Sequence, residues 1–115
     1  MPRHILSVAY DKALLDTRAA ILEARGYQVT SALGFSESID QCERGGFDLF
    51  LVGHSIPQVE IEKMIAVLRN NCRCPVLLLL APFEPIANAA EHAEQVVVST
   101  EPDELLEAVA KTLET

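Results

Sequence analysis

The chain of 115 residues contains 17 acidic and 9 basic side chains, which give a net charge of −8, and half of its residues are hydrophobic. A chain of this length and apolar content is expected to form one compact domain over residues 1–115, with a real core and no long disordered segment. The acidic balance argues against binding to nucleic acid or to an anionic membrane, because both need a basic face.

The N-terminal half of the chain alternates short apolar runs with helical patterns. Residues 5–9 predict a strand, residues 12–25 a helix, and residues 27–32, which carry β-branched side chains, a second strand. Ser36 is the predicted N-cap of a second helix, which ends at the glycine pair 45–46. The apolar side chains of the first helix recur at spacings of three and four residues and are Leu14, Leu15, Ala19, Ile21 and Leu22.

The C-terminal half continues the same alternation. Its predicted strands are 48–52, 75–81 and 96–98, and its predicted helices are 57–70, 85–92 and a last one that starts near Pro102 after a Thr100 cap. The inward stripe of the last helix is Leu105, Leu106, Val109 and Leu113. Strand and helix thus alternate five times, which predicts an α/β doubly wound fold, (βα)5, with three layers and a flavodoxin-like parallel sheet of order 2-1-3-4-5.

Targeting features are absent from the sequence pattern. The longest apolar run, residues 76–82, is much shorter than the roughly 20 residues that span a bilayer. The N-terminus lacks the long apolar region of a signal peptide, and three irregularly spaced cysteines imply no disulfide framework. We therefore expect a cytoplasmic protein without a membrane span.

Several segments together resemble the receiver domain of two-component response regulators, the CheY-like family. The resemblance covers essentially the whole chain and is carried by residues 5–8 leading to an Asp, 22–29, 47–52 followed by Ile56-Pro57, 75–78 and 102–106. It implies the CheY-like fold and a place in a two-component phosphorelay. An intact receiver site is expected to hold Mg²⁺ on two acidic residues after the first strand. An Asp after the third strand accepts the phosphoryl group, and a hydroxyl side chain and a Lys contact that group.

These functional positions are degenerate in this chain. The acidic pair matches Ala9 and Tyr10, with Asp11 one place later, and the phosphoacceptor position matches Gly53, which has no side chain. The hydroxyl position matches Leu80, and the Lys position falls at residues 97–100. The degenerate phosphorylation-site positions are Ala9, Tyr10, Asp11, Gly53, Leu80 and Val98. We therefore predict a pseudo-receiver with no catalytic residues, no enzymatic activity, no metal and no cofactor.

Two sharper interpretations concern residues at the strand ends. One interpretation makes His54 or Ser55 a replacement acceptor with Asp11 as its partner, but a loop histidine beside a Gly turn is the favoured interpretation. Ser99 and Thr100 are expected to cap the last helix in preference to binding phosphate.

The three cysteines raise the question of a metal site or a thiol sensor. Cys72 and Cys74 form a C-x-C, whereas zinc sites use four ligands and usually paired C-x₂-C spacing. Cys42 is predicted on an inward helix face. A cysteine-based sensor, and a small-ligand module that uses the vacated pocket, are the alternative functions.

The charge is unevenly distributed along the chain. Residues 1–73 carry 9 acids and 8 bases, whereas residues 74–115 carry 8 acids and only Lys111 as a base. Receivers typically pair or dock through the surface of the helix over residues 85–92, the fifth strand and the last helix. The predicted interaction face there comprises Glu84, Glu91, Glu94, Glu101, Asp103, Glu104 and Glu107. We expect this stand-alone domain, with no output domain, to bind a basic protein partner independently of phosphorylation, with a homodimer through the same face as the other option.

Overall fold

The computed structural model describes residues 2–53, 58–71, 74–80, 95–98 and 102–114. Within these ranges five parallel strands form one sheet in the order β2-β1-β3-β4-β5, so the predicted strand order is confirmed. The strands are β1 (His4–Ala9), β2 (Gln28–Leu33), β3 (Leu49–Val52), β4 (Val76–Leu80) and β5 (Gln95–Val98). The three central strands are short apolar runs because both of their faces are covered.

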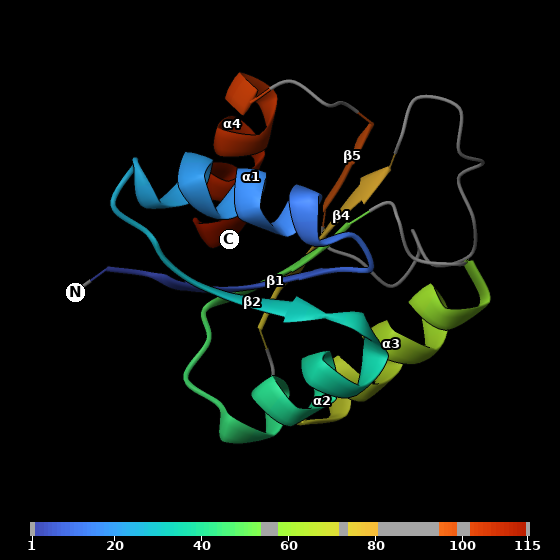
Figure 1. Ribbon diagram of the computed structural model, residues 1–115. Coiled ribbons are helices and arrows are strands. Elements are labelled where there is room, and N and C mark those ends of the chain that lie inside the picture. The colour runs from blue at the N-terminus through green and yellow to red at the C-terminus, as the bar shows by residue number, and fades with distance from the viewer. Residues whose placement is uncertain (1, 54–57, 72–73, 81–94, 99–101, 115) are drawn as a thin grey trace.

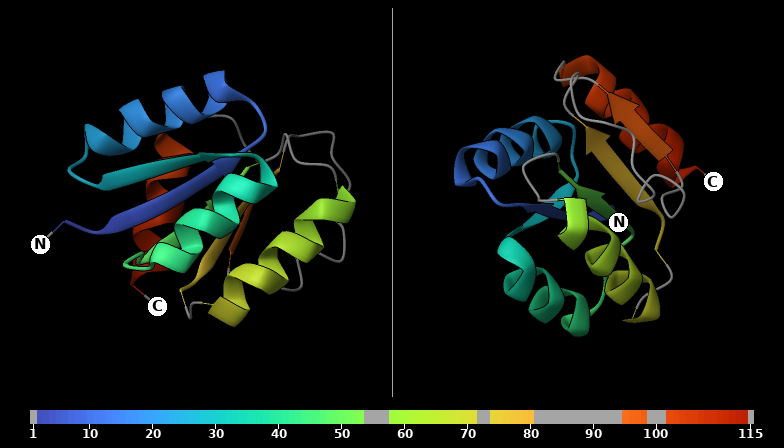
Figure 2. Two further views of the ribbon diagram at one scale, coloured as in Figure 1. Left: turned by 60° about the horizontal axis from the view of Figure 1, so that its bottom comes forward. Right: turned by 90° about the vertical axis from the view of Figure 1, so that its right-hand side faces the viewer.

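Four described helices cover the two faces of the sheet, as the views in Figure 1 and Figure 2 show. They are α1 (Lys12–Glu23), α2 (Gly34–Arg44), α3 (Gln58–Asn71) and α4 (Pro102–Leu113). Helices α1 and α4 lie together on one face, and α2 and α3 lie on the other. Residues 85–92, where a further helix is predicted, lie outside the described residues.

Two hydrophobic cores separate these layers, and alternate residues of β1 and β3 supply them. Leu6, Val8 and Phe50 point toward α2 and α3, whereas Ile5 and Leu51 point toward α1 and α4. The predicted inward residues of α3 are buried, which confirms that helix face; they are Ile61, Met64, Ile65 and Leu68. Along α4 the predicted Leu105 and Val109 are buried, while Leu106 and Leu113 are half-buried.

The prediction for the start of the second helix is wrong. Helix α2 begins at Gly34, two residues before the predicted cap Ser36, and its N-cap residue is Leu33. The Glu37 carboxylate accepts a hydrogen bond from the Leu33 N–H, at 2.5 Å, and so closes the helix start from inside its first turn. Because this carboxylate satisfies the terminal N–H, the helix starts without a hydroxyl side chain as its cap.

The register of the sheet sets which residues share its carboxyl edge. Val8 lies opposite Val52, and the Gly53 N–H donates a hydrogen bond to the Val8 carbonyl at 2.9 Å. Ala9 and Gly53, the next residues on the two strands, therefore lie side by side at the carboxyl edge of the sheet. Among the described residues, no helix is long and apolar enough to cross a membrane.

Candidate functional site

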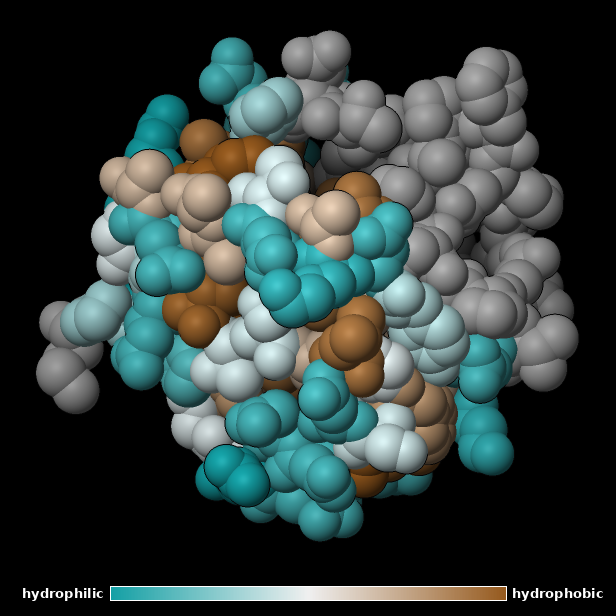
Figure 3. Space-filling model, in the orientation of Figure 1, coloured by the Kyte–Doolittle hydropathy of each residue, from teal (hydrophilic) through white to brown (hydrophobic). Residues whose placement is uncertain are grey.

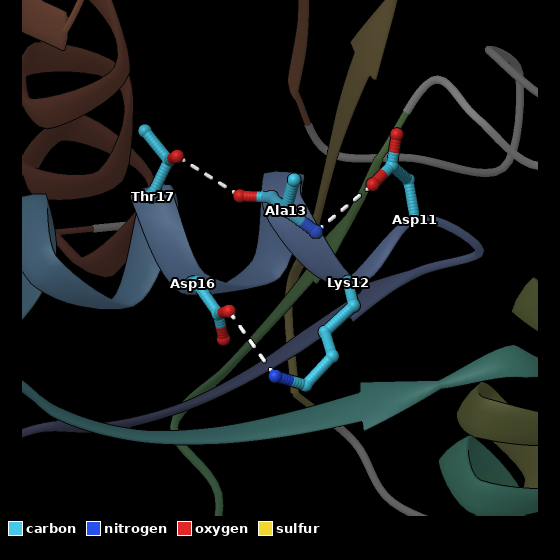
Figure 4. A network of polar contacts seen from close by, with 5 residues as sticks. All are labelled: Asp11, Lys12, Ala13, Asp16 and Thr17. Atoms are coloured by element: carbon cyan, nitrogen blue, oxygen red, sulfur yellow. Dashed lines mark hydrogen bonds and ion pairs between the residues drawn. The ribbon is translucent and has the colours of Figure 1, made fainter.

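Figure 4 shows the start of α1, which follows Ala9 and Tyr10, the positions that match the acidic pair. Asp11 is exposed, and its Oδ1 accepts a hydrogen bond from the Ala13 N–H at 2.9 Å, so its carboxylate caps the helix. Lys12 and Asp16 form an exposed ion pair at 3.4 Å one turn apart. The acid nearest to the candidate site therefore has a local structural role that the sequence analysis did not assign to it.

The two residues before Asp11 contribute no carboxylate. Ala9 is fully buried. Tyr10 is half-buried and packs against the core between the sheet and helices α2 and α3. Burial raises the pKa of the Tyr10 hydroxyl above its ordinary value, and the charge of Glu60 and a hydrogen bond to that carboxylate raise it further. Tyr10 thus stays a neutral phenol at neutral pH.

Gly53 follows β3 at the position predicted for the phosphoacceptor, and a side chain there would meet Arg18. A Cβ on Gly53 would lie 2.1 Å from Arg18 Nη1, 3.0 Å from Cζ and 3.2 Å from Nη2. The φ angle of Gly53 is not in the positive range, so its backbone would accept other residues. Packing against the guanidinium, rather than backbone conformation, is what makes glycine fit at this position.

Arg18 comes from the buried stripe of α1, between Leu15 and Leu22. Only 6% of the Arg18 surface is exposed, and its Nη1 is buried with no hydrogen-bond partner. Burial lowers the pKa of the guanidinium, and the nearby charge of Asp11 partly opposes this shift. The group nevertheless stays protonated at neutral pH. The structure therefore places a buried positive charge over the Cα of Gly53.

The remaining predicted positions are partly described. Leu80 and Val98 are paired across β4 and β5 in the register of the sheet. His54, Ser55, Ser99 and Thr100 lie outside the described residues, as do Cys72, Glu84, Glu91, Glu94 and Glu101. Asp103, Glu104 and Glu107 are exposed on α4, and the first two stand in its first turn, where acidic side chains stabilise a helix.

The described cysteines lie on the α2–α3 side of the sheet. Cys42 is buried on the inner face of α2, as predicted, and its thiol is oriented to the Leu68 carbonyl at 3.9 Å. The Cys74 thiol donates to the Phe47 carbonyl. Both thiols thus take part in packing between α2, α3 and the sheet.

No family model matches the chain, and no curated protein matches it. Solved structures do. A CheY-like response regulator receiver domain protein from Methanospirillum hungatei JF-1 has a TM-score of 0.87 at 22% identity, covering 99% of this chain and 95% of that one. The response regulator TrrA from Thermotoga maritima, solved with Mg²⁺ and BeF, has a TM-score of 0.83 at 22% identity, covering 96% and 98%. This chain has the CheY-like receiver fold.

The residues of this receiver fold do not suit Mg²⁺. Ala9 and Tyr10 offer no carboxylate, Gly53 offers no side chain, and the carboxylate of Asp11 caps α1. The guanidinium of Arg18 would repel a divalent cation at this edge. Among the residues that the structure describes, no group of three or more His, Cys, Asp or Glu side chains could hold a metal ion.

Arg18 is the residue that the sequence analysis missed. It lies three residues after Leu15 and four before Leu22, so it falls on the inward stripe of its helix. That spacing was a signal for burial, but the residue type argues for exposure. The partner position, Gly53, lies 35 residues further along the chain and only the fold brings it close.

Proposed function

We propose that this chain is a receiver-like signalling domain that binds a protein partner and is not phosphorylated on an aspartate. The observation that carries the proposal is the contact between Arg18 and Gly53. Gly53 has no nucleophile, and a cation fills the space where an acceptor side chain would begin. In this reading the phosphorylation site has changed its charge as well as lost its acceptor.

The chemistry of phosphoryl transfer supports this proposal. An acceptor carboxylate attacks phosphorus while a metal ion offsets the negative charge that gathers on the transferred group. Neither the carboxylate at Gly53 nor an acidic pair at Ala9 and Tyr10 is present. Covalent phosphorylation at these positions therefore cannot supply the differential contacts that shift a two-state equilibrium. We expect one constitutive conformation.

The proposed docking surface contains the exposed face of α4. Asp103, Glu104 and Glu107 are exposed there, and only Lys111 offsets them on that helix. In Figure 3 the described hydrophobic residues appear on the visible face as separate small patches among hydrophilic ones. Leu33, on the far edge strand β2, is the one large hydrophobic side chain among the described residues that is classed as exposed. Charge is thus a better guide to a partner than apolar area. A basic partner surface would complement the acidic face of α4.

A receiver-fold relative supports a protein as the partner. TrrA, 24% identical to this chain in that structure, was solved in complex with the histidine kinase ThkA, with a TM-score of 0.82. The salt dependence of association separates a basic partner from a homodimer through the same face. Salt weakens attraction between opposite charges, whereas it screens the repulsion between two acidic faces. Binding that strengthens with salt would point to the homodimer.

Intact-mass spectrometry after treatment with acetyl phosphate, with and without Mg²⁺, tests the proposal. We expect no gain of about 80 Da, the mass of one phosphoryl group, under either condition. A receiver domain with an intact acceptor aspartate, treated in parallel, shows that the donor is active. A stable Mg²⁺-dependent adduct on an aspartate of this chain would contradict the proposal.

A further inference from the structure

The guanidinium of Arg18 is a buried charge without a complete set of acceptors. Its side chain is 6% exposed, and Nη1 has no hydrogen-bond partner. The ion pairs between described residues involve Arg3 and Lys12, not Arg18. A buried guanidinium in this state is unfavourable, because it has lost its hydration, its Nη1 lacks an acceptor, and the nearby charge of Asp11 offsets the cost of burial only in part.

The packing around Arg18 does not require a charge. Leu15 and Leu22 flank it on the same helix stripe, and the core on this face of the sheet is built from Leu, Ile, Val and Ala side chains. A methionine of similar length would fill the space without an unsatisfied donor. Asp11, whose charge acts on Arg18, already accepts the Ala13 N–H as the α1 cap. The packing and the helix cap thus leave the Nη1 donor of Arg18 without an acceptor.

The position of Arg18 in the fold is where ligands of such sheets bind. The strand order β2-β1-β3 places the topological switch between β1 and β3, and Gly53 directly follows β3 at its carboxyl end. The missing side chain of Gly53 gives the guanidinium its place at this edge. A planar guanidinium binds a carboxylate or a phosphate through two parallel hydrogen bonds.

We propose that Arg18 binds a small-molecule oxyanion, a carboxylate or a phosphate, at the carboxyl edge of β1 and β3 without a metal ion. The inference rests on the burial and the incomplete hydrogen bonding of Arg18, and it does not depend on the protein-binding role proposed above. The oxyanion supplies the acceptors that Nη1 lacks. Binding is noncovalent, because Gly53 offers no group to be modified.

The test is an NMR titration of the ¹⁵N-labelled chain at constant ionic strength, with sodium chloride exchanged for sodium phosphate in one arm and for sodium acetate in the other. The reporters are the Gly53 amide and the side-chain Nε–H of Arg18. We expect saturable shifts at both reporters in at least one arm, and the arm that saturates identifies the oxyanion class. The shifts are unchanged when Mg²⁺ is added.

Matched variants assign the effect to Arg18. Arg18→Met is expected to abolish saturation, and Arg18→Lys, which keeps the charge but loses the planar fork, to weaken binding at least about tenfold. Arg25→Met removes an exposed arginine just beyond the end of α1 and is expected to bind as the parent does. Circular dichroism checks that each variant is folded. If Arg18→Met is unfolded, Arg18→Lys provides the test instead.

Three results would overturn the proposal. One is the absence of saturation in both arms up to about 50 mM, where even a millimolar site is filled. The second is equal binding by the parent chain and a folded Arg18 variant, which would place any anion elsewhere. The third is binding that appears only with Mg²⁺. A phosphorylated aspartate in the mass experiment would defeat the proposed function without touching this result.

Discussion

Polar groups near the two ends of strands β1 and β3 differ in how fully they are hydrogen-bonded. At the amino ends, the His4 N–H donates to Asp48 Oδ2 at 2.8 Å, and the Asp48 N–H donates to the His4 carbonyl at 2.7 Å. The His4 ring nitrogen Nε2 lies 2.7 Å from the Thr30 hydroxyl. At the carboxyl ends, the guanidinium of Arg18 from α1 is more deeply buried than His4 or Asp48, and its Nη1 has no hydrogen-bond partner.

The two ends of the sheet therefore differ in whether their polar groups find partners within the chain. At the amino ends, His4 and Asp48 hydrogen-bond one another, as partly buried polar groups usually do. A buried charge that lacks partners lowers stability, and such groups gather at functional sites. The hydrogen-bonded groups at the amino ends thus have a structural role, and the unpartnered Nη1 of Arg18 at the carboxyl ends is the basis of the anion binding proposed above.

Removal of the unsatisfied charge of Arg18 is expected to change the stability of the chain most. Arg18→Met should raise the free energy of unfolding by about 1–3 kcal/mol, because it removes a buried guanidinium with an unsatisfied donor and keeps most of the side-chain volume. Urea unfolding followed by circular dichroism measures the change. Arg25→Met, at an exposed position, should change stability by less than about 0.5 kcal/mol. A clear loss of stability in Arg18→Met would contradict the expectation that the buried guanidinium is destabilising.

The opposite sign is expected at the amino ends. Asp48→Ala should lower the free energy of unfolding by about 1 kcal/mol, because the His4 N–H loses its acceptor. The ion pair of Asp48 with Arg3, at 3.7 Å between exposed side chains, adds little. Asp48→Asn keeps an acceptor oxygen and should lose less. Equal stability of the parent chain and Asp48→Ala in urea would remove the contrast between the two ends.

The weakest effect on stability is expected at alkaline pH and involves Tyr10. Its pKa is raised in the folded chain above the ordinary value of 10.0, so the unfolded chain releases this proton first as the pH rises. Stability from this group is present below pH 10 and is lost as the pH rises through the folded pKa. In Tyr10→Phe this part of the alkaline decline should be absent, as urea midpoints between about pH 9 and 11 would show. Tyr27→Phe, on the other core face, is the control, and identical pH profiles for Tyr10→Phe and the parent would contradict the shift.

The fold was predictable because its signals are local and repeated. Buried parallel strands such as β3 and β4 are continuous apolar runs, and the right-handed crossover rule leaves few strand orders. The start of α2 was not predictable in this way, because the Glu37 carboxylate, instead of a hydroxyl cap, accepts the hydrogen bond at the helix start.

The candidate site was predictable only as a set of losses. The sequence alone shows that Ala9, Tyr10 and Gly53 stand where the receiver family has acidic residues. The sequence does not show that Arg18 replaces them, because its contact with Gly53 joins a helix and a strand end that are distant in sequence. An arginine on an inward helix stripe is the one local signal of that replacement.

Substitutions of Gly53 that differ only in charge test whether a cation stands at the predicted acceptor position. Gly53→Asp and Gly53→Asn have nearly the same shape, and both displace the flexible end of Arg18. With Arg18 present, Gly53→Asp should be more stable than Gly53→Asn by about 1–3 kcal/mol, because its carboxylate pairs with the guanidinium. In the Arg18→Met background the order should reverse, because the carboxylate is then buried alone. An Asp–Asn difference that is the same in both backgrounds would contradict the account.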